Sequence, residues 1–309
     1  MTMDLIRKLD KPRIIKGGCV VTVGNFDGVH MGHQAILRQL RAHADELDVP
    51  AVLLTFEPQP REYFQHEGAP ARLTPFREKF RLLEKQGVDK LVCLRFQQSL
   101  ANMQAQDFVQ KLFIDALGVR RIIIGDDFRF GKNRDGDIHT LRELGANAGF
   151  DVVPVDSFAI DGERVSSSAI RHALKRYDFA LAKTLLGRAY SISGRVRHGE
   201  KRGRQLGFPT ANVELKRVTT PLLGVYAAYV HGVGEKPCAS VVNIGTRPVF
   251  DGKKLLLEVH LLDFSEDIYG RYISVEFVER LRGEQKFSGI EELSAQIQRD
   301  IENARSLFT

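Results

Sequence analysis

The chain has 309 residues, long enough for two domains, and its hydrophobic content of 43% and charged content of 27% are those of an ordinary globular protein. Its three cysteines are widely spaced, which excludes a disulfide framework and a cysteine-rich metal site, and it has neither a run of about 18 apolar residues nor a signal-peptide core. We therefore expect a cytoplasmic protein with no membrane partner. The net charge of +6 suits nucleic acid or small polyphosphates as ligands and does not choose between them.

Apolar runs typical of buried strands alternate with amphipathic runs typical of helices in the N-terminal half. Strands are predicted at 19–23 and within 49–58, 89–96 and 120–125, and helices from residue 32, within 74–87 and within 105–118. In the second helix Thr74 is the expected N-cap, Pro75 the first residue and Gly87 the stop. The alternation predicts a doubly wound parallel sheet, which binds ligands beyond the carboxyl ends of its strands. The loops "GNFDGVHMGH" and "GDDFRFGKNRDGD" follow two of these strands and should share one cleft.

Two histidines, His30 and His33, lie where the first predicted helix begins, after a glycine-rich turn. Unpaired backbone N–H groups and the positive end of the helix dipole favour an anion there, usually a phosphate. Imidazole N–H groups beside them would suit a pentacovalent phosphorus whose equatorial oxygens gain charge. Two alternatives stay open: a capping pair with no chemical role, and a zinc site with Asp27 as third ligand, for which no fourth ligand is in sight. The motif resembles the HxGH element of the nucleotidyltransferase superfamily.

Two further stretches are candidates for the same cleft. In "RVSSSAIRHAL", hydroxyl and guanidinium groups open a predicted helix: Ser166, Ser167, Ser168 and Arg171. Alone this stretch indicates a serine N-cap, and together with the histidines it indicates a second phosphate clamp. In "GDDFRFG" two phenylalanines alternate with charged residues. Either this is a loop with one buried aromatic, or a ring stacks on a flat heterocycle.

The pattern changes near residue 187, where short alternating stretches with turn signals begin. They predict an antiparallel all-β domain, a small barrel, closed by a terminal helix. The apolar face of that helix comprises Ile290, Leu293, Ile297, Ile301 and Ala304. The expected fold class is thus α/β, with a doubly wound domain at 1–186, whose helical connector starts at about residue 168, and a barrel domain at 187–309.

The predicted barrel carries a glycine-rich cationic loop, "GEKRGRQLGFPTAN", whose backbone N–H groups can approach phosphate closely. It lacks the Gly-Lys-Ser/Thr ending of a Walker motif, and a solvated hairpin or a basic patch for nucleic acid remain alternatives. Thr210 and Asn212 favour the phosphate interpretation, because alternate strand residues share a face and can offer two hard oxygens to Mg²⁺. Glu258 lies inside an apolar strand pattern, where a charge is paired, exposed on an edge or used in chemistry.

Eight ordered motifs along nearly the whole chain resemble the bacterial bifunctional riboflavin kinase and FMN adenylyltransferase family, also called FAD synthetases: "GNFDGVHMGH", "TFEPQP", "GDDFRFG", "SSSAIR", "RGRQLGFPTAN", "GVYA", "NIGTRP" and "LEVHLLDF". The resemblance implies that the N-terminal domain transfers AMP from ATP to FMN, giving FAD and pyrophosphate, and that the barrel phosphorylates riboflavin with ATP and Mg²⁺. Its partners would be these small molecules and no nucleic acid, and a homo-oligomer is left open. Ser168 and Val249 depart from the family pattern, where threonine is usual, and only the second change removes a hydroxyl.

The same resemblance assigns a set of residues to each of the two activities. His30 and His33 hold the α-phosphate of ATP, and Glu258 is the general base of the kinase. The adenylyltransferase binds ATP and phosphate through Gly24, Asn25, Phe26, Asp27, Gly32, Ser166, Ser167, Ser168 and Arg171, and flavin through Phe56, Pro58, Asp127 and Phe128. The kinase binds ATP and phosphate through Gly199, Lys201, Gly203, Arg204, Gly207 and Pro209, and its metal through Thr210 and Asn212. Two other assignments stay open: a nucleotidyltransferase whose barrel only binds substrate, and a nucleic-acid-binding protein.

Overall fold

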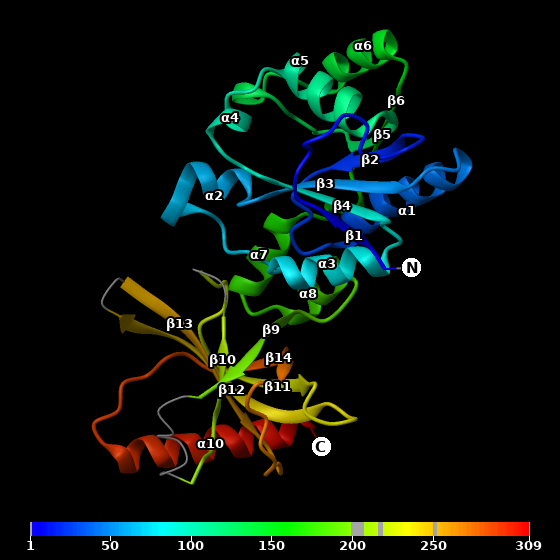
Figure 1. The fold of residues 1–309 in the computed structure, drawn as a ribbon. Coiled ribbons are helices and arrows are strands. Elements are labelled where there is room, and N and C mark those ends of the chain that lie inside the picture. The colour runs from blue at the N-terminus through cyan, green and yellow to red at the C-terminus, as the bar shows by residue number, and fades with distance from the viewer. Residues whose placement is uncertain (1, 199–206, 216–218, 250–251, 309) are drawn as a thin grey trace. The chain divides into compact units, whose positions relative to one another are not determined.

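The computed structural model describes residues 2–198, 207–215, 219–249 and 252–308, without the side chains of 67, 247–249 and 252–254. The chain divides into two compact units (Figure 1). The first unit comprises Met1–Pro70 and Phe76–Ser166, and the second comprises Ala71–Pro75 and Ser167–Thr309. The predicted connector therefore groups with the barrel, whereas the domain boundary at residue 187 stays a prediction. Within the described ranges, no helix is long and apolar enough to span a membrane.

The first unit is built on a six-stranded sheet with the order β1-β4-β3-β2-β5-β6 (Figure 1). Its strands are β1 (Asp4–Ile6), β2 (Cys19–Val23), β3 (Ala51–Glu57), β4 (Lys90–Arg95), β5 (Val119–Gly125) and β6 (Asp151–Val155). All neighbours pair in parallel, and the order reverses between β2 and β5. The loops that follow β2 and β5 therefore start side by side at the carboxyl edge, where doubly wound sheets bind ligands. The predicted doubly wound sheet is confirmed.

Helical segments cover both faces of this sheet, because alternate strand residues are buried on opposite sides. Val21 and Leu54 belong to one core, with η2, whereas Val20 and Leu53 belong to the other, with α1. The helical segments are α1 (Met31–Glu46), α2 (Pro60–Gln65), η1 (His66–Gly68), α3 (Phe76–Lys85), α4 (Gln98–Ala101), α5 (Ala105–Phe108), η2 (Val109–Leu117), η3 (Lys132–Arg134) and α6 (Ile138–Ala148), and a small hairpin joins β7 (Ala159–Ile160) to β8 (Glu163–Arg164). The helix predicted within 105–118 forms as α5 followed by a π-helix, η2, and α3 begins one residue later than predicted.

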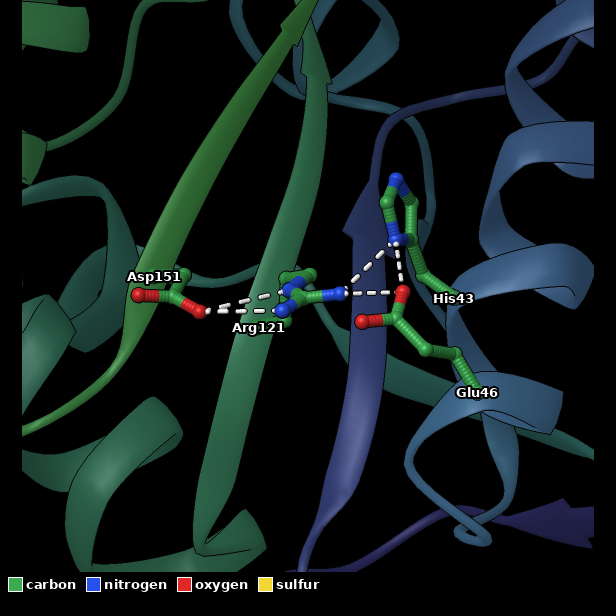
Figure 2. Close-up of polar contacts among 4 residues, drawn as sticks. All are labelled: His43, Glu46, Arg121 and Asp151. Atoms are coloured by element: carbon green, nitrogen blue, oxygen red, sulfur yellow. Dashed lines mark hydrogen bonds and ion pairs between the residues drawn. The ribbon is translucent and has the colours of Figure 1, made fainter.

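A charged network lies near the amino-terminal end of β5, away from these loops (Figure 2). Arg121 Nη1 is 2.8 Å from Glu46 Oε2 at the end of α1, and Arg121 Nη2 is 3.2 Å from Asp151 Oδ2 at the start of β6. His43 Nδ1 lies 2.8 Å from Arg121 Nη1 and 3.0 Å from Glu46 Oε2. The hydrogen bonds from His43 and Arg121 lower the pKa of the Glu46 carboxyl. The network therefore joins α1 to two neighbouring strands.

The second unit contains a closed antiparallel barrel with the strand order β10-β13-β12-β11-β14-β9, as predicted. Its elements are α7 (Ser167–Lys175), α8 (Phe179–Leu186), β9 (Ser191–Arg197), β10 (Ala211–Glu214), β11 (Gly224–His231), β12 (Cys238–Val249), β13 (Gly252–Leu261), β14 (Tyr272–Arg282) and α10 (Ile290–Phe308). The terminal helix α10 buries Ile301 and Ala304 against the barrel. The predicted apolar face is wrong at Ile290, which is 68% exposed because the helix begins there.

Aromatic side chains hold the connector helices to the barrel. The ring of Phe179, at the start of α8, stacks on Phe277 of β14 with 6.1 Å between centroids and 13° between planes. The guanidinium of Arg280 lies 4.0 Å from the ring centroid of Tyr177. Such contacts add to the burial of the rings themselves. The connector is therefore part of the packed core of the second unit.

Candidate active sites

The loop after β2 holds a strained backbone between two buried side chains. Phe26 and Val29 have φ angles of 47° and 43°, in the left-handed region, and Gly28 between them has a φ of 87°. For a residue other than glycine this conformation costs about 1–3 kcal/mol, and it persists only where its surroundings enforce it. Phe26 and Val29 are 2% and 1% exposed, so burial of their side chains provides that enforcement. The loop is thereby held in a fixed path that ends at His30.

His30 is the N-cap of α1. Its Nδ1 accepts a hydrogen bond of 3.3 Å from the backbone N–H of His33, so that the proton of the neutral ring lies on Nε2. A Cβ atom on Gly32 would lie 3.3 Å from two atoms of the His30 ring, which explains the glycine between the histidines. The capping interpretation is thus correct for His30.

The two imidazoles are stacked, with ring centroids 3.6 Å apart and planes at 16°. Burial of the His33 ring, followed by the charges of His30 and Lys79, holds the pKa of His33 well below its usual range. His33 Nδ1 is buried and has no hydrogen-bond partner within the described part of the chain. Buried polar atoms without a partner are rare in proteins and mark places where a ligand can bind. A neutral His33 keeps one ring N–H group, which can serve as a hydrogen-bond donor to a phosphate.

The zinc alternative for this loop finds no support in the described ranges. Asp27 is buried, at 3% exposure, but no cluster of three or more His, Cys, Asp or Glu side chains there could hold a metal ion. Gly24 precedes this loop, and a Cβ atom on it would lie 3.1 Å from the Phe26 ring. The carbonyl of Asn25 accepts a hydrogen bond of 3.1 Å from Lys79 Nζ. Of the predicted loop residues, Phe26 contacts the histidine pair, with its ring centroid 4.6 Å from that of His33.

The residues predicted to bind flavin follow β3 and β5, at the same edge of the sheet. Phe56 is buried and packs edge-on against Phe96, with ring centroids 5.8 Å apart. Pro58 is exposed. Asp127 is exposed as well and forms an ion pair of 2.5 Å with Arg164 of β8. This placement is compatible with a ligand site for Pro58 and Asp127, whereas Phe56 is mainly a core residue.

Two aromatic rings at this edge, those of Tyr63 and Phe64, were not predicted from the sequence, whereas Phe128 was. Phe128 is half-buried and stacks on the buried Phe130, with centroids 5.5 Å apart. Tyr63 and Phe64 of α2 both contact Phe96, and Phe64 is 63% exposed. An exposed ring of this size beside a candidate site is available for stacking on a flat ligand. The adjacent aromatic pair Tyr63 and Phe64, which follows "FEPQP" after two residues, was the signal that could have identified them.

The second predicted phosphate clamp lies at the start of α7. Ser166 ends the first unit, whereas Ser167, Ser168 and Arg171 belong to the second unit. Arg171 Nε donates a hydrogen bond of 2.6 Å to the carbonyl of Ala71, which fixes the side chain within its own unit. A phosphate site shared by these residues and the histidines stays a prediction.

In the barrel, register brings three polar side chains to adjacent positions. Glu258 of β13 lies opposite Asn212 of β10 on one side and opposite Asn243 of β12 on the other. Asn243 Nδ2 is 3.5 Å from Glu258 Oε2. Leu257 and Val259 are buried, so that the half-buried Glu258 lies on the opposite face of the strand from them. The structure therefore brings together Asn212 and Glu258, which are 46 positions apart in the sequence.

The histidine two residues further along β13 has a different partner. His260 Nδ1 donates a hydrogen bond of 2.9 Å to the carbonyl of Pro209, which can only accept. This contact holds the segment that leads into β10. Gly207, at a φ of 83°, precedes it in a left-handed turn. His260 thus has a structural role, while Glu258 keeps a carboxylate on the half-buried face.

A pocket of about 510 Å³ opens beside Thr210. Its lining includes His198, Pro209, Thr210, Val259, Leu261 and Tyr269. The rings of His198 and Tyr269 lie against each other with centroids 3.9 Å apart. A pocket of this size, with an aromatic wall and polar groups, is large enough for a nucleotide. The predicted residues Gly199, Lys201, Gly203 and Arg204 lie outside the described residues, as does the side chain of Val249.

The donors at this place suit Mg²⁺ better than a softer metal. Thr210 and Asn212 offer a hydroxyl and an amide oxygen, and both residues are half-buried. Mg²⁺ takes oxygen ligands and usually keeps water and substrate phosphates among them, so that two protein oxygens are enough. Zinc would require imidazole or thiolate ligands, and the described residues contain no cluster of that kind.

In comparison with known proteins, two parts of the chain match two different family models. Residues 13–169 match the family model for FAD synthetase, and residues 186–308 match that for riboflavin kinase.

Bifunctional riboflavin kinase/FMN adenylyltransferase from Escherichia coli K12 is 49% identical over 94% of this chain and 93% of its own. The enzyme of that description from Pseudomonas fluorescens is 49% identical over 99% of this chain and 98% of its own. A crystal structure from Streptococcus pneumoniae, described as a macrolide-efflux protein, is 30% identical with a TM-score of 0.82 and covers 99% of both chains. The chain therefore belongs to the bifunctional riboflavin kinase/FMN adenylyltransferase family, which phosphorylates riboflavin to FMN and converts FMN to FAD.

Proposed function

We propose that the first unit carries out the adenylyl transfer and that His30 and His33 donate hydrogen bonds to the α-phosphate of ATP. The observation that carries this proposal is the stacked imidazole pair at the start of α1, in which the buried Nδ1 of His33 has no hydrogen-bond partner within the described ranges. A phosphate oxygen of FMN bonds to the α-phosphorus while the bond to the bridging oxygen breaks, and pyrophosphate leaves with the electron pair. Charge builds up on the equatorial oxygens, where donors that are already in place stabilise the transition state.

The remaining predicted residues complete this site. In the first unit, ATP binds through Gly24, Asn25, Phe26, Asp27, Gly32 and Ser166. Ser167, Ser168 and Arg171, at the start of α7, are assigned to phosphate binding as well. The flavin binds at the ends of β3 and β5, through Phe56, Pro58, Asp127 and Phe128. The exposed ring of Phe64 supports a flat ligand at this edge. Because no proton needs to be removed from a phosphate oxygen, neutral histidines suffice for this reaction.

For the second unit, we propose that Glu258 is the general base of riboflavin phosphorylation. A ribityl hydroxyl attacks the γ-phosphorus of ATP, its proton passes to the Glu258 carboxylate, and ADP leaves with the bridging oxygen. ATP occupies the pocket beside Thr210, with Gly199, Lys201, Gly203, Arg204, Gly207 and Pro209 around its phosphates. Thr210 and Asn212 hold Mg²⁺, which when bound neutralises charge on the phosphates. The pairing of Glu258 with Asn212 across two strands supports this arrangement.

The state of the cysteine thiols supports a proposal for the cellular compartment of the protein. Cys19 and Cys93 are buried, and burial raises the pKa of Cys19 to about 12, so that its thiol is unreactive. Buried cysteines that form no disulfide are typical of proteins in a reducing compartment. We propose a cytoplasmic enzyme that acts on riboflavin, FMN and ATP, with no nucleic-acid partner.

The test is Glu258→Gln, which keeps the size and hydrogen bonding of the side chain and removes its basicity. Riboflavin phosphorylation should fall by about a hundredfold to ten-thousandfold, as expected when a general base is lost. FAD formation from supplied FMN, measured on the same preparation, should not change. Glu276→Gln is a matched control, because Glu276 lies on barrel strand β14 and pairs with His231 at 2.9 Å. Near-normal kinase activity in Glu258→Gln would reject Glu258 as the base, and His260→Asn would then be tested.

A further inference from the structure

Lys79 carries an ammonium group into the interior of the first unit, where the residue has no solvent exposure. It lies on the apolar stripe of α3, among Phe76, Phe80 and Leu83, all of which pack in the core beneath α1. A buried charge is costly unless it is well paired, and an apolar side chain of the same length often packs there equally well or better. Packing alone therefore does not explain a lysine at this position.

Three partners of Lys79 lie at the carboxyl ends of β2 and β3. Lys79 Nζ donates a hydrogen bond of 3.1 Å to the backbone carbonyl of Asn25, in the loop that leads to the histidines. It also lies 3.5 Å from Thr55 Oγ1 and 3.7 Å from Glu57 Oε1, both on β3. The shortest of these contacts is to the loop, one residue before the strained Phe26. The ammonium group thus bridges the active-site loop and the neighbouring strand.

We propose that Lys79 is a positioning residue of the adenylyl transfer, whose buried ammonium group fastens the loop after β2 to β3 and so holds His30 and His33 in place for the α-phosphate. This inference rests on the proposed role of the histidines. Burial of Phe26 and Val29 already holds the loop, and Lys79 adds a direct link from the loop backbone to β3, which opposes relaxation of the left-handed residues. A charged hydrogen bond to a backbone carbonyl is stronger than a neutral one.

The charge of Lys79 also acts on the histidine pair directly. Its positive charge, after burial and the charge of His30, contributes to the lowered pKa of His33. Glu57 is the opposing charge beside Lys79, and its side chain is 22% exposed, so that water screens it partly. A neutral His33 avoids repulsion from the His30 ring stacked on it. The position of the lysine therefore serves both the geometry and the charge state of the pair.

The test uses the full-length protein and three substitutions. Lys79→Met keeps the side-chain length without the charge, Lys79→Arg keeps the charge, and Lys85→Met removes a charge from an exposed position of the same helix. Lys79→Met should lower kcat for FAD formation by about tenfold to hundredfold, because a shift of about 1 Å in reacting groups can cost a hundredfold in rate. Its riboflavin phosphorylation and melting temperature should stay at the wild-type values. Lys79→Arg should recover part of the lost rate, and Lys85→Met should lose none.

NMR titration of the His33 ring adds a readout that a packing role would not move. In Lys79→Met, His33 should become protonated at higher pH than in the wild type. Wild-type FAD formation in Lys79→Met would overturn the proposal, and so would a loss that comes with a lower melting temperature and an unchanged His33 titration. His33→Ala distinguishes the proposed role of the histidines from the proposed role of Lys79. If His33→Ala keeps FAD formation, the proposed function fails, whereas loss in His33→Ala with full activity in Lys79→Met rejects only the role of Lys79.

Discussion

Substitution of His30 can separate its role as a helix cap from its role in adenylyl transfer. His30 Nδ1 accepts the backbone N–H of His33 at 3.3 Å, a bond that asparagine can accept in its place and alanine cannot. Loss of a cap costs about 1 kcal/mol, which lowers the melting temperature of a unit of this size by about 2–4 °C. We therefore expect His30→Ala to melt below His30→Asn by this amount.

Both substitutions remove the imidazole donor, so that both should lose FAD formation about a hundredfold or more, equivalent to roughly 3 kcal/mol of transition-state stabilisation. His33→Ala should lose as much, although His33 Nδ1 has no hydrogen-bond partner among the described residues. The assay follows FAD made from supplied FMN and ATP, with FMN made from riboflavin on the same preparation as the control. If His30→Asn recovers FAD formation together with the melting temperature, capping is its whole role and the reasoning is refuted.

Two further predictions concern each unit by itself. A fragment of residues 167–309 should fold and phosphorylate riboflavin. It should melt at a higher temperature than a fragment of residues 187–309, because the shorter fragment exposes the aromatic surface on which the connector packs. Equal melting temperatures would contradict this. Arg121→Met should lower the melting temperature of the first unit at pH 7. The hydrogen bonds that lower the pKa of Glu46 stabilise the fold above the unfolded pKa of this carboxyl, and their contribution is lost as the pH falls through its lowered folded pKa. The difference in melting temperature should therefore shrink in acid, and a difference that is constant from pH 7 to below the pKa of Glu46 would show that the pairing has no role.

The parts of the fold that depend on burial could be predicted from the sequence. The strand at Cys19–Val23 was located at both ends, since all its residues are buried and glycine-rich turns flank it. The alternation of strands and helices implied the reversal of strand order that brings the loops after β2 and β5 to one edge. The barrel was recognised for the same reason, because alternating patterns in short segments reflect one buried face for each strand.

Features that depend on tertiary packing or on strand register could not be predicted from the sequence. Ile290 fits the apolar period of α10 but is exposed, because the first turn of the helix extends past the barrel surface. The sequence period is also nearly the same for an α-helix and a short π-helix, so that η2 was not distinguished. The pairing of Asn212 with Glu258 needs the register of two strands distant in sequence, which local pattern does not contain.

Several residues that break local rules lie at the edge of the first unit that holds the histidine pair. Phe26 and Val29 adopt a backbone conformation that their side chains disfavour, Lys79 places a charge on an apolar stripe, and His33 leaves a buried nitrogen without a partner among the described residues. Each of these features costs stability, and a fold selected for stability alone would lose them one by one. All of them belong to the loop after β2 or to residues in contact with it. Left-handed residues other than glycine also occur elsewhere in the unit, for example Asp48 and His66, and so do buried atoms without a partner among the described residues, for example Gln59 Nε2. The features named here differ from those because they meet at the histidine pair, which links them to the proposed site.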